Sequence, residues 1–275
     1  MSVKQKAFSV LTAPIRKIFS RSNAVNTTLL QNFSMERRVK KGVTDLLFYC
    51  PNRTTLWRTE TFFTKEPDTI EWLDSFKPGE ILFDVGANVG LYTLYAAQKG
   101  VRVVAFEPES QNYALLNRNI YLNGLSDRVC ALNLALTSED KLDYLYLNQF
   151  ISGGALNNFG EEIDYEKKHF HSAFKQGACA FKLDSFLELF KQEVPDHLKI
   201  DVDGLEAAVI DGALETLKNT KLKSVLIELN TKLPEDIKVL EILKSAGFKV
   251  KRQYHCPLVN EQFDGIDNFT LVRDQ

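Results

Sequence analysis

The segment of this chain best suited to bind a ligand has glycine or a polar residue at every second position. Asp84, Gly86, Asn88 and Gly90 follow an apolar run, and a helical pattern comes directly after them. Glycine lets the backbone adopt unusual dihedral angles and lets a ligand approach closely, and the start of a helix offers unpaired N–H groups. The pattern predicts a cofactor-binding turn between a strand and a helix, in which Ala87 also takes part.

The acid at the start of this turn separates two classes of cofactor. The dinucleotide fingerprint G-x-G-x-x-G holds a pyrophosphate. Here the third glycine is missing, and the carboxylate of Asp84 would repel a pyrophosphate but attract an ammonium group. The methionine part of S-adenosylmethionine carries such a group. We therefore expect S-adenosylmethionine as cofactor, with a nicotinamide dinucleotide as the disfavoured alternative.

A second acid closes the next apolar run. Glu107 stands 23 residues after Asp84, and Pro108 follows it at the start of another helical pattern. A carboxylate in this place accepts hydrogen bonds from ribose hydroxyls. The third strand ends near Asn133 and Ala135, where we expect backbone contacts with the adenine. The alternative is that Asp84 and Glu107 are surface acids at strand ends.

A third group of acids follows the apolar run at 197–200. Asp201, Asp203 and Glu206 stand at the end of a predicted strand and the start of a predicted helix. Ligands of open α/β sheets bind outside the carboxyl ends of the strands, so these acids should face the same crevice. Asp201 and Glu206 are the catalytic candidates, Asp201 is also a cofactor contact, and Asp203 a substrate contact. The alternative is helix N-terminal acids that the helix dipole favours.

Other substrate contacts are predicted on loops. Ser152 and Gly153 belong to a flexible polar stretch that closes over donor or acceptor, or else forms an ordinary turn. Glu66 borders the acceptor site. Trp57 and Trp72 either stack on a sugar or belong to the core.

No metal site is expected. His169 and His171 lie near Cys179, but a fourth ligand at a familiar spacing is missing. The two histidines are further candidates for a general base, although surface positions on a substrate loop fit them better.

The elements that must position these residues alternate between apolar strands and amphipathic helices. Strands separated by helices of this length predict βαβ units and a parallel sheet. Ahead of them, 45–50 and 54–63 are rich in β-forming residues and predict a hairpin, and 66–76 predicts a helix. The interval 148–177 lacks clear periodicity and predicts a long loop. The predicted organisation is a basic N-terminal extension (1–44), a hairpin and helix packed on the core (45–77) and an α/β domain (78–275).

Composition places the chain among ordinary globular proteins. It has 275 residues, a hydrophobic fraction of 44%, a charged fraction of 25% and a net charge of −2. Residues 1–41 nevertheless carry nine Lys or Arg and one acid. This basic arm either makes a peripheral contact with an anionic membrane or partner, or is a solvated extension. The acidic remainder argues against a nucleic-acid partner, and four cysteines without a C-x-x-C pair fit a reducing, cytoplasmic setting.

Four segments together resemble the FkbM-type methyltransferases: 83–90, 105–108, 119–124 and 200–206, with 226–228 continuing the pattern. The resemblance covers about residues 65–272. It implies the Rossmann-like fold of class I methyltransferases, with a mostly parallel seven-stranded sheet, an antiparallel last strand and helices on both faces. Members usually have Glu where this chain has Asp203, which puts the role of Asp203 in doubt.

The resemblance also implies O-methylation of a hydroxyl on a sugar, glycan or small natural product. Two alternatives stay open: an inactive module that binds the donor or a protein partner, and a dehydrogenase that uses NAD. The sequence does not decide the oligomeric state.

Overall fold

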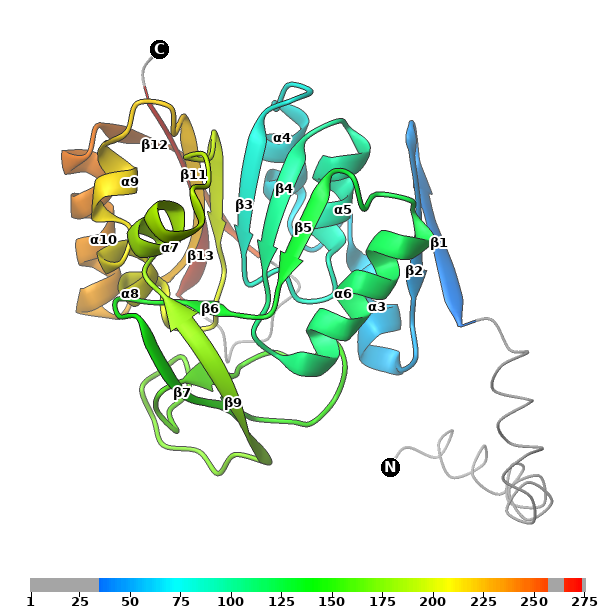
Figure 1. The fold of residues 1–275 in the computed structure, drawn as a ribbon, viewed down its shortest axis with the longest axis horizontal. Coiled ribbons are helices and arrows are strands. Elements are labelled where there is room, and N and C mark those ends of the chain that lie inside the picture. Colours follow the sequence, from blue (N-terminus) through cyan, green and yellow to red (C-terminus); the bar gives the residue numbers. More distant parts are fainter. Residues whose placement is uncertain (1–34, 257–264, 274–275) are drawn as a thin grey trace. The chain divides into compact units, whose positions relative to one another are not determined.

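The apolar runs form the strands of one seven-stranded sheet. The computed structural model describes residues 35–256 and 265–273, and Figure 1 shows their arrangement. The strands of this sheet are, in chain order, β3 (Ile81–Val85), β4 (Arg102–Phe106), β5 (Val129–Leu132), β10 (His197–Ile200), β11 (Ser224–Asn230), β12 (Phe248–His255) and β13 (Ile266–Arg273). Their order across the sheet is β12-β13-β11-β10-β3-β4-β5, and β13 runs antiparallel to both of its neighbours. The predicted Rossmann-like fold with one antiparallel strand is confirmed.

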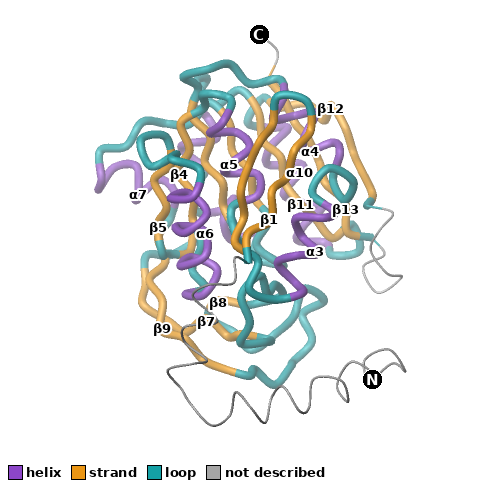
Figure 2. The backbone as a smooth tube through the Cα atoms, turned by 90° about the vertical axis from the view of Figure 1, so that its right-hand side faces the viewer, coloured by secondary structure: helices purple, strands orange, loops and turns teal. Residues whose placement is uncertain are grey.

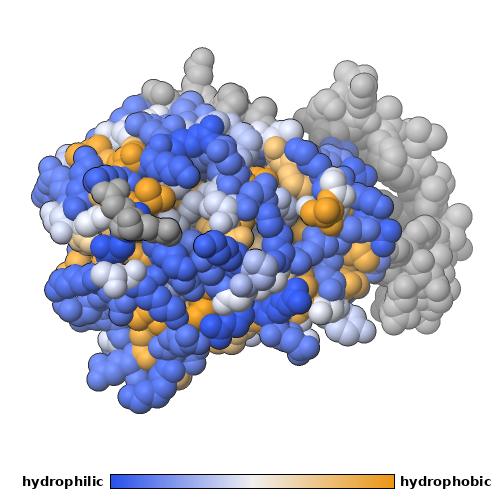
Figure 3. All heavy atoms as spheres, turned by 90° about the horizontal axis from the view of Figure 1, so that it is seen from above, coloured by the Kyte–Doolittle hydropathy of each residue, from blue (hydrophilic) through white to orange (hydrophobic). Residues whose placement is uncertain are grey.

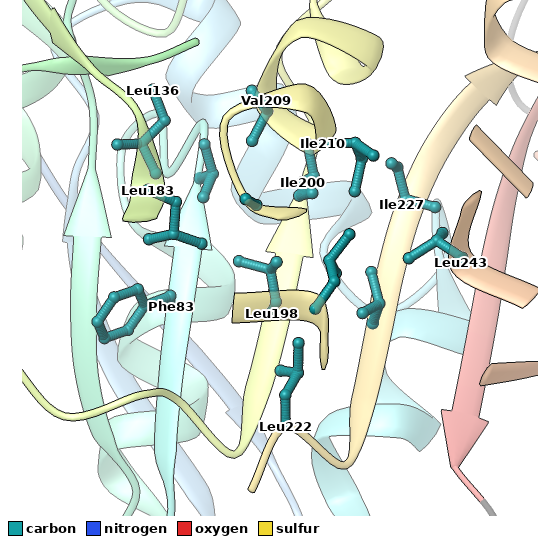
Figure 4. Packing of buried hydrophobic residues seen from close by; sticks show 14 of the residues in the cluster. Phe83, Leu136, Leu183, Leu198, Ile200, Val209, Ile210, Leu222, Ile227 and Leu243 are labelled. Carbon is teal, nitrogen blue, oxygen red and sulfur yellow. The ribbon is translucent and has the colours of Figure 1, made fainter. Parts of the chain in front are cut away.

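Both faces of the sheet are covered by helices, so the central strands β3 and β10 are buried along their whole length. Successive residues of β3 point to opposite faces: Phe83 belongs to one core and Leu82 to the other. The first core is covered by α7 (Leu183–Phe190), α8 (Glu206–Asp211), α9 (Leu214–Lys218) and α10 (Pro234–Ser245). Figure 4 shows part of its packing, with Val209 and Ile210 against Ile200. The second core is covered by α4 (Pro67–Asp74), α5 (Leu91–Gln98) and α6 (Ser110–Leu122).

The N-terminal part of the described chain differs from its prediction. A hairpin is present, but it joins β1 (Glu36–Lys41) to β2 (Thr44–Tyr49), whereas the predicted second strand forms the helix α3 (Arg53–Thr61). The basic residues of β1 therefore belong to this hairpin, which begins ahead of the boundary predicted at residue 44. Figure 2 shows the hairpin beside α5 and α6. The rest of the predicted basic arm, residues 1–34, lies outside the described residues.

A cap at Asn52 explains why α3 is a helix despite its threonines. The side chain of Asn52 accepts a hydrogen bond from Thr55 N at 2.9 Å, and the Thr55 hydroxyl accepts one from Asn52 N. This reciprocal capping box satisfies two N–H groups at the start of the helix. The local β-preference of Thr54 and its neighbours is weaker than the cap and the tertiary contacts together.

A second sheet follows β5, beyond the carboxyl ends of β3, β4 and β5 (Figure 1). It consists of β6 (Ala135–Leu136), β7 (Lys141–Leu147), β8 (Asn158–Phe159) and β9 (Phe174–Phe181), in the order β6-β9-β7-β8. The interval 148–177, predicted as a loop, thus contains β8 and the first half of β9. Its strands escaped prediction because β9 pairs with β7, more than twenty residues earlier, and its burial alternates only weakly.

The surface seen from above the view of Figure 1 is mainly hydrophilic, with small scattered hydrophobic areas (Figure 3). Within 35–256 and 265–273, no helix combines the length and the apolar character that crossing a membrane requires.

Candidate active site

The carboxyl ends of β3, β4, β10 and β11 open onto a cavity of about 320 Å³. Its wall contains the loops that follow these strands, residues 154–157 of the insertion and part of β13. A side pocket of about 50 Å³ adjoins it and shares Gly86, Asn88 and Asp201 with it. Ligands of open α/β sheets bind at this edge. Most of the predicted site residues converge here, although several lie behind the wall.

Gly86 forms the wall at the turn after β3. Its φ is +84°, and a Cβ atom would lie 1.8 Å from the backbone oxygen of Asp201, so no other residue fits. Gly90 serves packing instead, because a Cβ there would meet the Leu116 side chain at 2.4 Å; its absence allows α5 to pack against α6. Gly86 and Asn88 line the cavity, Ala87 lines only the side pocket, and Gly90 lines neither.

Asp84 lies beneath the wall rather than in it. The Thr93 hydroxyl donates to one carboxylate oxygen at 2.5 Å, and the other oxygen has no hydrogen-bond partner among the described residues. Burial raises the pKa of Asp84, while the nearby charge of Lys199 opposes that shift. The structure does not bring Asp84 to the cavity surface, so any effect on an ammonium group would act through its charge.

Glu107 is held in the wall by backbone amides. Its two oxygens accept hydrogen bonds from Asn88 N at 2.7 Å and from Glu109 N at 2.9 Å. Burial raises the pKa of Glu107 to about 8, although these two bonds favour the charged form. Each carboxylate oxygen has a further lone pair that remains for a ligand. The carboxylate is therefore oriented in advance for two hydroxyl donors, and Pro108 lines the cavity beside it.

Of the two predicted adenine contacts, one lines the cavity and the other lies behind its wall. Ala135 lines the cavity together with Leu134 and Leu136, which makes this part apolar. Asn133 does not line it. Its side-chain amide donates to the backbone oxygens of Glu107 and Pro108 at 3.0 Å and 2.9 Å, so it supports the turn after β4.

The three acids after β10 all line the cavity, but they differ in their partners. Asp201 accepts a hydrogen bond from the buried Lys199 amine at 2.8 Å. Burial opposes the ionisation of Asp201, but the charges of Lys199 and Lys65 outweigh burial and lower the pKa of Asp201. Glu206 accepts bonds from the amides of Val202 and Gly204, each at 2.9 Å, and burial raises its pKa to about 8. Glu206 thus closes its own loop, which argues against the predicted catalytic role.

Asp203 joins the loop after β10 to the insertion. It adopts a left-handed φ of +58°, and its carboxylate accepts a bond from Leu156 N at 2.7 Å. Burial, followed by the charge of Asp201, raises the pKa of Asp203 to about 6. Because Asp203 anchors the insertion, its contact with a substrate would be secondary to this role.

The predicted flexible stretch at Ser152 and Gly153 is a strap fixed by side-chain amides and a guanidinium. Asn52 donates to Ser152 O and Arg58 to Gly153 O, each at 2.8 Å. Asn112 accepts from Gly153 N at 2.7 Å. Ser152 and Gly153 therefore do not line the cavity, whereas the next residues, 154–157, do.

Asn88 and Asn112 complete the strap from the Rossmann-like side. Both side chains donate to Gly154 O, at 2.8 Å and 3.1 Å. Asn52 and Asn112 were not predicted, because their partners lie 100 and 41 residues away in the chain.

Glu66 lines both pockets and is buried. Its carboxylate binds the Lys65 amine at 2.5 Å and the Tyr92 hydroxyl at 2.9 Å. Burial opposes the charge on Lys65, but Glu66 and Asp201 outweigh it and hold the pKa of Lys65 above its usual value.

The two tryptophans lie in different places, one in the cavity wall and the other in the core. Trp57 lines the cavity, whereas Trp72 is buried in the core and donates to the Ser224 hydroxyl at 2.8 Å. His169 and His171 are exposed on the insertion, outside the cavity wall. Across the described ranges, no three His, Cys, Asp or Glu side chains are grouped to hold a metal ion.

The polar residues of the wall that were not predicted include one on each of three neighbouring strands: Glu228 on β11, Tyr254 on β12 and Asn268 on β13. Glu228 carried a usable signal, because it stands near the carboxyl end of an apolar strand, as Asp201 does. Tyr254 stands in the same way near the carboxyl end of β12. Asn268 carried no such signal, since only the antiparallel direction of β13 brings the amino end of that strand to this edge.

This geometry agrees with a comparison of sequences. The family profile described as the methyltransferase FkbM domain matches residues 84–250, from Asp84 to the first half of β12. The chain belongs to this family of methyltransferases. Membership implies S-adenosylmethionine as the methyl donor, and it displaces the dehydrogenase alternative.

Similar proteins include methyltransferase sdnD of Sordaria araneosa, 29% identical over 196 residues that make up 62% of this chain and 74% of that protein. The 31-O-demethyl-FK506 methyltransferase FkbM of Streptomyces tacrolimicus is 41% identical over 61 residues, 21% of this chain and 24% of that protein. Among solved structures, a precorrin-6y C5,15-methyltransferase from Geobacter metallireducens is similar with a TM-score of 0.46 and 13% identity, over 77% of this chain and 90% of that one.

Proposed function

We propose that this protein transfers the methyl group of S-adenosylmethionine to a hydroxyl of a sugar, glycan or small natural product. The observation that carries the proposal is the carboxylate of Glu107, which two backbone amides hold in the cavity wall beside the close turn at Gly86. The carboxylate is a fixed hydrogen-bond acceptor for the two hydroxyls of a ribose. Gly86, which has no side chain, leaves room beside it for the methionine chain attached to that ribose.

The residues present fit the donor in each of its parts. Glu107 would hold the ribose, and the apolar wall at Leu134, Ala135 and Leu136 suits the adenine. Asp201 in the wall would attract the ammonium group, with the charge of Asp84 beneath it. When bound, the donor supplies a methyl group on a positively charged sulfur. The protein itself then has to align the acceptor with that methyl group and to exclude water.

The charges around the cavity favour an acceptor without negative charge. Glu66, Asp201, Asp203 and Glu228 line it, against Arg58 and Lys65. A phosphate or carboxylate acceptor would face more acids than bases, which argues against a nucleic acid. Trp57 offers an aromatic face of the kind that sugars stack on. The name of the FkbM relative, a 31-O-demethyl-FK506 methyltransferase, indicates transfer to oxygen in that protein and supports the same chemistry here.

Calorimetric titration with S-adenosylmethionine, and separately with NAD, tests the donor. We expect micromolar binding of S-adenosylmethionine, loss of that binding in Glu107→Ala, and no change in Glu139→Ala, an exposed acid outside the cavity. Preferential binding of NAD would refute the proposal.

Mass spectrometry then tests the acceptor. The protein and S-adenosylmethionine are incubated with methyl glycosides of common hexoses and 6-deoxyhexoses, and we expect a gain of one methyl group on at least one of them. Donor binding without transfer to any acceptor hydroxyl would favour an inactive donor-binding module.

A further inference from the structure

Three polar side chains form a row across three neighbouring strands at the cavity. Glu228 of β11 lies opposite Asn268 of β13, and Asn268 lies opposite Tyr254 of β12. Residues directly opposite each other in antiparallel strands point to the same face of a sheet. All three line the cavity. The row therefore presents a carboxyl, an amide and a phenol side by side to whatever fills the cavity.

The side chains of this row have no hydrogen-bond partners within the protein that the structure describes. Other polar groups of the wall have them: the amides of Asn88 and Asn112, for example, bind Gly154 O. Asn268 is only 6% exposed and lines the cavity, so its amide is open to the cavity rather than to the outer surface. These groups are therefore suited to bind a ligand with several hydroxyls, each of which can donate and accept.

Glu228 also differs from the other carboxylates of the wall. Backbone amides occupy five of them, Lys65 and Tyr92 occupy a sixth, and Lys199 occupies the seventh; in chain order the seven are Glu66, Glu107, Glu109, Asp201, Asp203, Glu206 and Asp236. Among the described residues, Glu228 is the one lining carboxylate without a hydrogen-bond or ion-pair partner, so both of its oxygens are available to an acceptor hydroxyl.

We propose that Glu228, Asn268 and Tyr254 bind the acceptor and that Glu228 receives the proton of the reacting hydroxyl. This inference rests on the proposed transfer to oxygen. The acceptor oxygen forms a bond to the methyl carbon while the carbon–sulfur bond breaks and leaves its electron pair on sulfur. The hydroxyl proton passes to a carboxylate oxygen of Glu228. Asn268 and Tyr254 hold neighbouring hydroxyls and so decide which oxygen faces the methyl group.

The surroundings of Glu228 strengthen it as a base. Ile200 of β10 pairs with Ile227 of β11. Asp201 and Glu228 are the next residues along these two parallel strands, so they stand side by side. Burial raises the pKa of Glu228 well above its usual value, and the charge of Asp201 adds to this, while Lys65 opposes it. A positively charged sulfur nearby would favour the ionised form again, so binding of the donor should release a proton from Glu228.

Proton release provides a test that needs no acceptor. Calorimetry at pH 7.5 in buffers of different ionisation enthalpy gives the number of protons released when S-adenosylmethionine binds. We expect fewer protons from Glu228→Gln than from the wild type, unchanged release from Glu241→Gln on the exposed side of α10, and less release with neutral S-adenosylhomocysteine. Equal release by the wild type and Glu228→Gln would overturn the role of Glu228, whatever the acceptor is.

Transfer to the best methyl glycoside is the second test. General-base catalysis contributes roughly 10²–10⁴-fold, so Glu228→Gln should lower kcat by that factor when the donor is saturating. Asn268→Ala and Tyr254→Phe should instead raise KM for the glycoside. Full activity of Glu228→Gln would refute the inference. If the wild type methylates no glycoside, the proposed acceptor class fails and proton release alone decides the role of Glu228.

Discussion

The amine of Lys199 lies 2.8 Å from the carboxylate of Asp201, and Lys199 is only 1% exposed. The charge of Lys199 also makes the largest contribution to stabilising the ionised form of Asp84, the acid beneath the wall. One buried cation thus serves the acids of two neighbouring strands, β3 and β10. A buried lysine of this kind is tolerated because its charge is compensated on both sides.

Replacing this lysine should destabilise the protein strongly. Lys199→Met keeps most of the volume but leaves Asp84 and Asp201 without their cation, and losing one partner of a buried pair typically costs about 3–5 kcal/mol. Urea denaturation measures the free energy of unfolding. Lys218→Met, which removes an exposed pair with Glu215, is the control and should change it by less than about 1 kcal/mol. Equal effects of the two variants would contradict the role given to Lys199.

The affinity for S-adenosylmethionine should rise with pH through about 8. Glu107 has a pKa of about 8 in the free protein because it is buried, and its ionised form is the better acceptor for ribose hydroxyls. Calorimetric Kd values between pH 6.5 and 9 check this. Glu107→Gln should bind roughly 10-fold more weakly or worse, given about 1.5–3 kcal/mol for a hydrogen bond to a charged group, and its residual affinity should depend less on pH. A pH dependence as steep as that of the wild type would speak against Glu107.

Glu206 should make the protein less stable as pH rises. Its pKa is about 8 in the folded state, above the usual 4.5, so the folded state holds a proton that the unfolded state releases. The resulting stability is fully present below about pH 4.5 and is lost as pH rises through 8, with at most about 1.4 kcal/mol per pH unit for one proton. Unfolding free energies at pH 6, 7 and 8 should fall less steeply in Glu206→Gln. Parallel curves for the two proteins would rule out this assignment.

Gly86→Ala should be far more damaging than an alanine at another left-handed glycine. At Gly86 the new Cβ would lie 1.8 Å from Asp201 O, whereas at Gly124, with φ +61°, nothing lies within 4 Å. Both variants suffer the backbone strain of about 1–2 kcal/mol, so their difference isolates the clash. We expect Gly86→Ala to lose at least about 2 kcal/mol more, measured as the shift of the urea midpoint. A similar loss in both variants would mean that β3 and β10 can move apart.

Asn112→Ala should loosen the strap. It removes one bond to Gly153 N and one to Gly154 O, and a buried donor left without a partner costs about 1–3 kcal/mol. The amide of Gly153 should exchange with solvent roughly 10-fold faster or more, as measured by hydrogen exchange. Asn117→Ala on the exposed side of α6 should leave that rate unchanged, because Asn117 binds only Tyr113 O of its own helix. An unchanged rate in Asn112→Ala would show that the other strap contacts suffice.

Local pattern was sufficient for the sheet and for its binding turn. The apolar run of β3 followed by Gly86, and Glu107 at the end of β4, identify the binding edge because strand ends and close turns are properties of a few consecutive residues. The same reasoning failed for α3, where local β-preference opposed the cap at Asn52 and the contact of Arg58 with the distant Gly153 O. It also misjudged Gly153, which is fixed by side chains of two other segments, α3 and α6.

The sequence by itself determined the alternation of strands and helices, the family and the position of the glycine turn after β3, because these depend on periodicity and on short contiguous motifs. The tertiary structure alone decided that Asp84 lies beneath the wall, that Ser152 and Gly153 form a strap, and that Glu228, Asn268 and Tyr254 form one row. The physical reason is that burial, hydrogen-bond partners and strand register arise between residues far apart in the chain. Local spacing carries no information about which distant residue will occupy a lone pair or leave it free.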